Sequence, residues 1–330
     1  MLALKDFSEN DMKSIMSTTV TVVGAGGLGS PALRLLTAIG FGKIRIIDRD
    51  IVELSNIQRQ TIYNTQDIGE PKVEAAATNL KLINPDIEIE PICISINEEN
   101  VIDLLRGADI ILDGLDSFKT RRAVNRASQE LKIPYIFAGA VEYYANLSTF
   151  VPEKTGCLNC VMGNAEDNPD NTCAQVGVTP TLLSLAAAVE VNEAVRLATG
   201  REPTLGNRLM TIDSSSLTFD FFDIGKSEEC SICSNVGQST ITKSNEISVT
   251  QLCSQGFNIS PPRIEIINLK ELAQKLEDSY SVKSTNRWIL VRFRNGERLT
   301  LMASGSAIVR GVDTADDAIR LYESVLNENT

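Results

Sequence analysis

The feature that most constrains this sequence is a glycine-rich turn placed between two regular patterns. Residues 20–23 (VTVV) form a short β-branched run, and residues 24–29 (GAGGLG) follow directly. After the last glycine, apolar residues recur every three or four positions, so a period of two gives way to a period of 3.6. Pro31 suits the first turn of a helix, and Gly40 suits the position that ends it. We therefore predict a strand, a glycine turn and a helix in that order.

Such a turn predicts a nucleotide site. Glycines let the backbone come close to a phosphate, and the free N–H groups at a helix N-terminus favour negative charge. A second predicted strand, 43–47, ends in Asp48 and Asp50, where an acidic side chain can accept hydrogen bonds from ribose hydroxyls. The candidate contacts in the turn itself are Gly24, Gly26, Gly27, Leu28 and Gly29.

The glycine motif alone does not distinguish NAD from ATP, because dinucleotide-binding proteins share it. A site that splits a triphosphate needs several cations on the phosphates and a carboxylate for Mg²⁺. Arg59 lies in a polar loop, Lys72 starts the next predicted helix, and Asp116 follows a buried-type strand at 110–112. These three residues favour ATP with Mg²⁺ and are our candidate catalytic groups. An NAD-dependent oxidoreductase, the first alternative, would leave them without a task. Further candidate nucleotide contacts beside them are Ser55, Asn56, Gln58, Gln60 and Ser117.

Composition excludes several classes of protein. The 330-residue chain carries a formal charge of −12 and no basic stripe, which argues against a nucleic-acid partner. No run approaches the roughly 18 apolar residues of a membrane span, and the N-terminus lacks the apolar core of a signal peptide. We therefore expect a cytoplasmic protein. The chain has no histidine, which excludes Ser-His and Cys-His catalysis. Adenylation of a carboxylate survives that exclusion because the nucleophile is already ionised and needs no general base.

The order of elements predicts an α/β fold, a Rossmann-like doubly wound sheet that is mostly parallel. Strands expected at 146–151, 208–212 and 217–222 would add to it in antiparallel fashion. An unusually apolar helix, 179–199, is expected in the core or at a dimer interface. The domains predicted are 1–235 for nucleotide and zinc, a Ser/Thr/Asn-rich linker at 236–248, and a small α+β domain at 249–330 that binds a partner.

Two CxxC pairs, separated by 69 residues, form a second constellation. Four thiolates are the ligand set of a tetrahedral structural zinc site, and a reducing cytosol disfavours the alternative of disulfides. The predicted zinc ligands are Cys157, Cys160, Cys230 and Cys233.

Six segments, taken in order, carry a family resemblance. GAGGLGS, DRD, LSNIQRQ, GEPKVE, LDGLDS and TCAQVGV, spread over roughly residues 14–235, resemble the ThiF/MoeB/HesA family, relatives of the ubiquitin-activating enzymes. The resemblance implies ATP-dependent adenylation of the C-terminal glycine of a small ubiquitin-like or sulfur-carrier protein ending in Gly-Gly, carried out by a homodimer. It puts the adenosine ribose on Asp48, the phosphates on Asn56, Arg59 and Lys72, and Mg²⁺ on Asp116.

The resemblance leaves two questions open. Family members carry a cysteine at the place of Cys173, proposed to form a thioester or persulfide with the carrier; a small packing residue is the alternative. Relatives also begin with an arginine-bearing segment that reaches the partner subunit's site, whereas no arginine here precedes Arg34. Either that role is missing or Lys5 or Lys13 serves it. The missing arginine is the best support for a second alternative, a non-catalytic nucleotide-binding adaptor of the same fold.

Overall fold

The structure is a computed structural model and describes residues 1–163, 165, 176–234, 247–252, 256–261 and 266–327. The chain divides into two compact units. The first comprises Met1–Ile47, Val52–Ile92 and Ile96–Thr242, and the second comprises Asp48–Ile51, Cys93–Ser95 and Lys243–Thr330. The predicted linker falls outside the described residues, apart from its last two.

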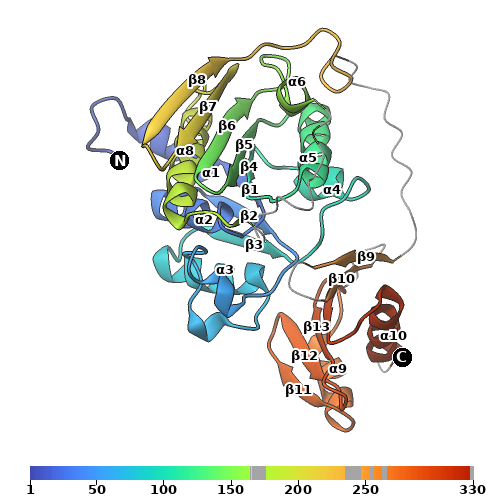
Figure 1. Cartoon of the computed structure of the whole chain (residues 1–330). Helices are drawn as coiled ribbons and strands as arrows, with labels where there is room; N and C mark the ends of the chain where they lie inside the picture. Colours follow the sequence, from blue (N-terminus) through green and yellow to red (C-terminus); the bar gives the residue numbers. More distant parts are fainter. Residues whose placement is uncertain (164, 166–175, 235–246, 253–255, 262–265, 328–330) are drawn as a thin grey trace. The chain divides into compact units, whose positions relative to one another are not determined.

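An eight-stranded sheet forms the centre of the first unit, in the order β3-β2-β1-β4-β5-β6-β7-β8 (Figure 1). Strands β1 to β5 pair in parallel, and β6, β7 and β8 are added in antiparallel fashion, so the predicted fold class is confirmed. The strand order reverses between β1 and β4, and the crevice at the carboxyl ends of strands at such a point is where ligands bind. The strands span Thr19–Val23, Lys43–Ile47, Glu88–Ile92, Ile110–Asp113, Tyr135–Val141, Tyr144–Phe150, Arg208–Asp213 and Thr218–Asp223.

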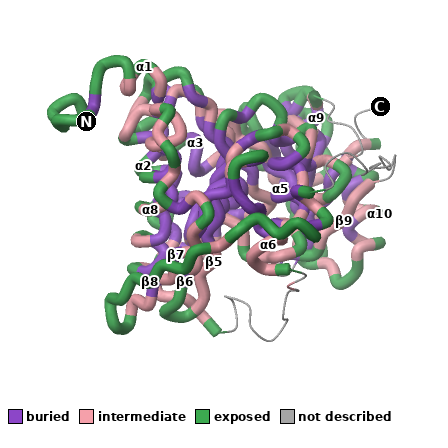
Figure 2. Tube along the Cα trace, turned by 90° about the horizontal axis from the view of Figure 1, so that it is seen from above, coloured by how far each residue is buried: buried purple, intermediate pink, exposed green. Residues whose placement is uncertain are grey.

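Helices cover both faces of this sheet. Figure 1 shows α4 (Val101–Leu105) and α5 (Phe118–Leu131) on one side, and α2 (Gly29–Ile39) and α8 (Pro180–Ala198) on the other. The remaining helices are α1 (Glu9–Ser17), α3 (Lys72–Ile83) and α6 (Leu158–Met162), with short 3₁₀ turns at Leu54–Asn56 and Thr65–Asp67. Figure 2 shows buried residues in the interior of the tube and exposed ones on its outside. Strand β4 is buried throughout and β1 almost throughout, whereas β8 is exposed along its whole length.

The apolar character of α8 is explained by the core of its own chain. Leu182, Leu183 and Ala186 pack with Leu28 and with buried residues of β6 and β7. Of the two locations expected for this helix, the core is confirmed, and the dimer interface stays a prediction.

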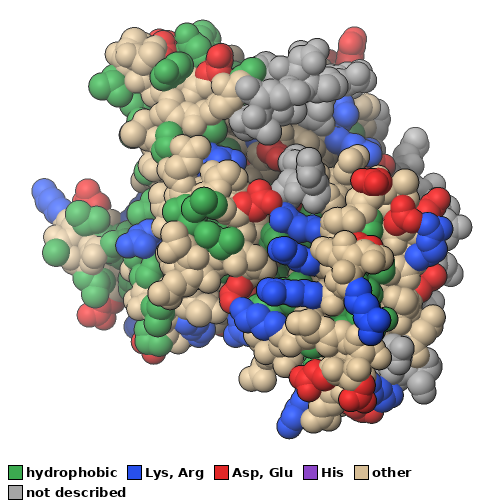
Figure 3. Space-filling model, turned by 60° about the horizontal axis from the view of Figure 1, so that its bottom comes forward, with side chains coloured by type: hydrophobic (Ala, Val, Ile, Leu, Met, Phe, Trp, Pro, Cys, Tyr) green, Lys and Arg blue, Asp and Glu red, His purple; other side chains and the backbone are tan. Residues whose placement is uncertain are grey.

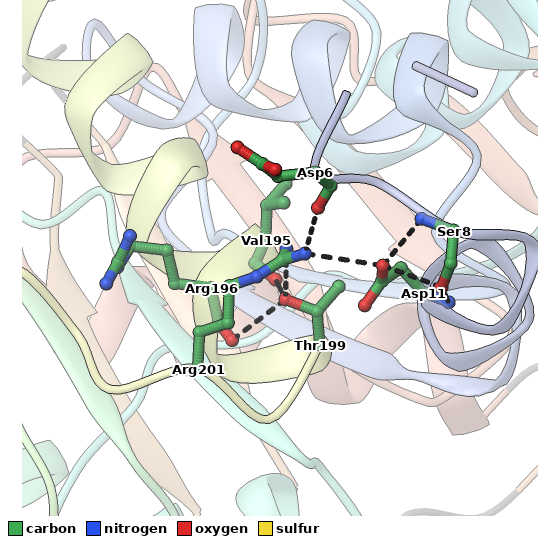
Figure 4. Close-up of polar contacts among 7 residues, drawn as sticks. All are labelled: Asp6, Ser8, Asp11, Val195, Arg196, Thr199 and Arg201. Carbon is green, nitrogen blue, oxygen red and sulfur yellow. Dashed lines mark hydrogen bonds and ion pairs between the residues drawn. The ribbon is translucent and has the colours of Figure 1, made fainter. Parts of the chain in front are cut away.

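The N-terminal segment is fastened to the end of α8 (Figure 4). Ser8 caps α1, and its N–H donates to the Asp11 carboxylate at 2.7 Å. The Arg201 guanidinium donates to Asp6 O at 2.6 Å and to Asp11 Oδ2 at 3.3 Å. It also lies 5.9 Å from the centre of the Phe7 ring. This arginine, just beyond α8, fixes the direction in which the chain enters the fold.

The second unit is an α+β structure, as predicted. Its six antiparallel strands run in the order β11-β12-β13-β14-β10-β9, and an apolar core joins one face of the sheet to α9 (Leu269–Glu277) and α10 (Ala315–Asn327). The predicted hairpin at Asn295-Gly296 is present, with Gly296 at φ +98°. The strands span Ser248–Gln251, Phe257–Ser260, Ser281–Ser284, Trp288–Arg292, Arg298–Met302 and Ala307–Arg310, from β9 to β14.

Two short segments from earlier in the chain belong to this second unit, which the sequence did not indicate. The Ser95 hydroxyl donates to Asn258 Oδ1 at 2.9 Å, and the Ser306 hydroxyl donates to Cys93 O at 2.5 Å. Residues 48–51, which directly follow β2, also group with it.

Across the part of the chain that the structure describes, no helix has both the length and the hydropathy that crossing a bilayer requires. The face drawn in Figure 3 carries basic and acidic side chains with hydrophobic ones between them. The net charge of −12 therefore does not make this surface uniformly acidic.

Candidate functional site

The glycine turn opens at the carboxyl end of β1. The Gly24 N–H donates to Ile47 O at 2.7 Å, which ties the turn to the end of the neighbouring strand β2. Gly24 has φ +96°, a conformation that strongly favours glycine. Leu28 is buried at the N-cap of α2, and the Ser30 N–H donates to Gly26 O at 2.9 Å. The turn thus lies at the N-terminus of an eleven-residue helix, where backbone N–H groups favour an anion.

Three glycines pack backbone against backbone beneath the turn. A Cβ added to Gly29 would lie 1.8 Å from Gly24 O, and one added to Gly114 would lie 2.2 Å from the same oxygen. The Gly114 N–H also donates to Val23 O at 2.7 Å. No side chain fits between these segments, so the loop after β4 is held directly against the glycine turn.

That loop presents Asp116 two residues beyond Gly114. Asp116 is exposed, and Ser117 forms the N-cap of α5 by accepting a hydrogen bond from the Thr120 N–H at 3.2 Å. A solvent-accessible carboxylate at this edge of the sheet is a suitable ligand for a hard cation such as Mg²⁺.

The polar loop 55–60 is also connected to the glycine turn. Gln60 is 3% exposed, and its Nε2 lies 3.9 Å from the position of a Cβ on Gly26. Within the described residues, Gln60 Oε1 is buried without a hydrogen-bond partner. The Tyr63 hydroxyl donates to Ala25 O at 2.9 Å. An unpaired buried acceptor beside a backbone cradle fits a ligand that brings its own donors, such as a nucleotide.

The other polar residues of this loop differ in exposure. Asn56 is buried, and its Oδ1 accepts from the Glu53 N–H at 3.1 Å. Arg59 is half-buried and donates through Nη1 to Ser55 O at 3.0 Å. Ser55 and Gln58 are exposed.

Lys72 begins α3 and is 5% exposed, so it is not an ordinary solvated lysine. Just before Lys72, the chain lies beside Val52. The Gly69 N–H donates to Val52 O, and the Val52 N–H donates to Glu70 O. The helix dipole does not favour a cation at this position, because it favours negative charge at a helix N-terminus.

The two acidic candidates after β2 lie close together. The Asp48 carboxylate accepts from the Asp50 N–H at 2.7 Å. Asp48 follows Ile47, which pairs with Val23 beside the turn. Cys173 lies outside the described residues.

Several residues near the site were not predicted from the sequence. Asp113, Arg121 and Tyr135 form a buried cluster, in which Arg121 Nε lies 3.0 Å from Asp113 Oδ2. Glu190 of α8 is also fully buried, and burial raises its pKa well above the ordinary value. The nearby Asp113 carboxylate adds to that rise, whereas the Arg121 guanidinium opposes it. The sequence shows an aspartate at 113 and an arginine at 121, but it gives no sign that their side chains form an ion pair.

The four predicted zinc ligands come together. Their sulfur atoms all lie within 4.8 Å of one another, and the closest described pairs are 3.4, 3.6 and 3.9 Å apart. Zn–S bonds of about 2.3 Å in a tetrahedron place sulfurs roughly 3.8 Å apart, whereas a disulfide needs about 2.05 Å. The cluster is therefore a set of free thiols with the spacing of a Cys₄ metal site.

Comparison with known proteins fits this arrangement. The model of the ThiF family matches residues 1–232. The chain belongs to the ThiF family. Its match spans the glycine turn, the polar loop, the loop of Asp116 and three of the four clustered cysteines.

Two curated relatives are informative. The "SAMP-activating enzyme E1" of Haloferax volcanii is 33% identical over 230 residues, which cover 69% of this chain and 84% of the relative. The "Sulfur carrier protein ThiS adenylyltransferase" of Bacillus subtilis is 28% identical over 321 residues, or 94% of this chain and 93% of the relative. The second alignment therefore extends into the C-terminal unit.

Solved structures show the same fold. The crystal structure of Escherichia coli MccB with ATP has a TM-score of 0.61 and 26% identity, and the match covers 68% of this chain and 69% of that one. Another, of MccB with AMPCPP and MccA, has a TM-score of 0.62.

Proposed function

We propose that the protein uses ATP to adenylate the C-terminal carboxylate of a small sulfur-carrier or ubiquitin-like protein ending in Gly-Gly, and releases pyrophosphate. The observation that carries the proposal is the membership of residues 1–232 in the ThiF family, together with a glycine turn packed against the loop of Asp116. Relatives named as adenylyltransferases of sulfur-carrier proteins support it.

The chemistry requires two anions to approach each other. The carboxylate of a protein C-terminus is ionised at neutral pH and attacks the α-phosphorus, so repulsion rather than deprotonation is the obstacle. Arg59 and Lys72 would neutralise phosphate charge, and backbone N–H groups of residues 24–29 would hold phosphate oxygens. Asp116 would hold Mg²⁺, which when bound supplies further positive charge for the departing pyrophosphate.

A candidate docking surface for the carrier lies at the same edge of the sheet. Strand β5 is parallel to β4, and β7 runs in the same direction, so the turns after β5 and β7 lie at the carboxyl edge together with the glycine turn. The Ser214 N–H donates to Tyr143 O at 2.8 Å and joins these two turns. Tyr143, Tyr144 and Leu217 there are 55%, 48% and 68% exposed. We propose that this apolar patch (Tyr143, Tyr144, Leu217) receives the body of the carrier while its tail reaches the nucleotide.

The cysteine cluster would hold a structural Zn²⁺ through Cys157, Cys160, Cys230 and Cys233. The metal would join the start of α6 to the segment after β8. Reduced thiols in this role suit a cytoplasmic location, which we also propose. Cys173 remains our candidate for a later thioester or persulfide with the carrier.

Two features rest on family resemblance. We propose a homodimer, which sedimentation of the purified chain would test. We also propose that the C-terminal unit binds a protein partner, since the relative whose alignment extends into it is named for acting on a sulfur carrier protein. Cross-links from the carrier to residues 248–327 would support that role.

ATP–pyrophosphate exchange is the test of the activity. We expect exchange that depends on a Gly-Gly-ended carrier protein from the same organism and is lost with Asp116→Ala. Asp86→Ala, which replaces another exposed acid after α3, is the matched control and should retain exchange. ATP binding without exchange by any such carrier would favour the adaptor, and preferential stabilisation by NAD over Mg·ATP would favour the oxidoreductase.

A further inference from the structure

We propose that Asp113, Arg121 and Tyr135 are positioning residues that hold the loop carrying Asp116 in the geometry required for metal-dependent adenylyl transfer. The inference rests on the role proposed above for Asp116. It assigns a task to a buried charged cluster.

Asp113 is the centre of the cluster. It ends β4 with no exposed surface, and its two carboxylate oxygens accept three hydrogen bonds. Oδ1 accepts from the Leu115 N–H at 2.8 Å, and Oδ2 accepts from Arg121 Nε at 3.0 Å and from the Tyr135 hydroxyl at 2.5 Å. These bonds join the end of β4 to the loop at Leu115, to α5 at Arg121 and to β5 at Tyr135.

Arg121 also hydrogen-bonds to the same loop, at the carbonyl of Leu115. Its Nη2 donates to Leu115 O at 2.5 Å and to Ala138 O at 2.9 Å in β5. The rings of Phe118 and Phe137 both lie with their centres 5.4 Å from the guanidinium carbon and leave it little freedom. Because Arg121 sits on the first turn of α5, the helix that follows the loop is anchored to the strand that precedes it.

Leu115 is consequently held at both of its backbone polar groups, its N–H by Asp113 and its carbonyl by Arg121. That carbonyl belongs to the peptide bond that leads into Asp116. One residue earlier, Gly114 is locked against the glycine turn. The backbone of the loop is thus fixed up to the residue proposed to hold the metal, while the Asp116 side chain remains exposed.

Stability alone does not account for such a cluster. Burying an ion pair costs about as much as the pairing returns, and apolar replacements of similar volume are often neutral or stabilising. Groups that orient metal ligands, by contrast, typically change metal affinity about 10–100-fold when they are removed. The Asp116 carboxylate also interacts with the cluster. The pKa of Arg121 is raised overall: burial opposes the rise, Asp113 contributes most to it, and Asp116 adds a smaller part.

The test compares two conservative variants with a matched control. Arg121→Lys keeps the charge but loses the fork that reaches two carbonyl groups, and Tyr135→Phe removes a single hydroxyl without leaving a cavity. Glu193→Gln is the control, because Glu193 is 1% exposed and accepts three hydrogen bonds away from this loop. If Arg121→Lys fails to fold, Tyr135→Phe alone decides.

Two readouts are measured on the full chain. The first is the Mg²⁺ concentration that gives half-maximal pyrophosphate exchange. The second, independent of turnover, is the binding of Mn²⁺ to the complex with a non-hydrolysable ATP analogue, followed by electron paramagnetic resonance. We expect both to weaken about tenfold in Arg121→Lys and severalfold in Tyr135→Phe, with excess metal restoring most exchange. Glu193→Gln should lower the melting temperature without changing either readout.

Asp116→Ala separates the possible failures. If it abolishes exchange while the cluster variants behave like Glu193→Gln, the positioning role is wrong and the proposed function stands. If Asp116→Ala leaves exchange and Mn²⁺ binding intact, the metal role of Asp116 is wrong and the inference falls with it.

Discussion

Replacing Gly114 with alanine tests the contact on which the site geometry depends. The new Cβ would lie 2.2 Å from Gly24 O and 3.1 Å from the Cα of Gly29. Both neighbours are backbone atoms of the glycine turn, so no side chain can rotate away. Ordinary contact begins near 3.4 Å, so the loop and the turn must separate by about 1 Å.

This displacement sets the expected magnitudes. Overpacking of this kind costs about 1–3 kcal/mol, which lowers the Tm of a unit of this size by roughly 2–12 °C. A shift of about 1 Å between reacting groups costs about 100-fold in rate. We therefore expect Gly114→Ala to stay folded and to lose about 100-fold in pyrophosphate exchange.

Gly225→Ala provides the control, because no heavy atom lies within 4 Å of its added Cβ and its φ is not left-handed. Exchange and thermal unfolding are measured for both variants and the parent protein. Comparable exchange rates in the two variants would refute the idea that close packing of the turn and the Asp116 loop sets the catalytic geometry.

Three further outcomes are expected. Cys230→Ser, or treatment with a strong chelator, should lower the zinc content found by elemental analysis from about one per chain. Either change should also reduce the free energy of unfolding by several kcal/mol. A parent protein without zinc would contradict the Cys₄ assignment. The free energy of unfolding of Glu190→Gln should rise relative to that of the parent as the pH increases above about 4.5. In that range the folded parent keeps the proton on Glu190, whereas its unfolded chain loses it, so the parent alone is destabilised. A difference in unfolding free energy that does not change with pH, measured by chemical denaturation, would contradict this. Tyr143→Ala should raise the KM for the carrier about tenfold with kcat little changed. Leu82→Ala, equally apolar and 82% exposed on α3, should not; equal effects would exclude the patch as a docking surface.

Much of the fold was readable from local patterns. The glycine turn, the helix that begins at Gly29 and the left-handed Gly40 at its end follow from short-range periodicity and glycine chemistry. The four cysteines of the proposed zinc site could be identified from the sequence, because two CxxC pairs have few other uses where disulfides are disfavoured.

The rest depends on contacts between residues far apart in the chain. Gly114 gave no sign that it would pack on Gly24, 90 positions earlier, because glycine in a loop has many uses. In the sequence, Tyr63 is indistinguishable from an ordinary core aromatic residue. Only the structure shows that its hydroxyl donates a hydrogen bond to Ala25 O. The burial of Lys72 was likewise hidden, since a lysine in a first helical turn is usually solvated.

The central claim is that the protein activates a carboxylate as an acyl-adenylate. Intact mass spectrometry of a Gly-Gly-ended carrier, incubated with the protein and Mg·ATP and kept cold, tests it most directly. We expect a carrier heavier by one adenylyl group, and we expect this product to be absent with Asp116→Ala and with a carrier lacking its last glycine. An unmodified carrier under conditions where ATP is consumed and pyrophosphate is removed would contradict it.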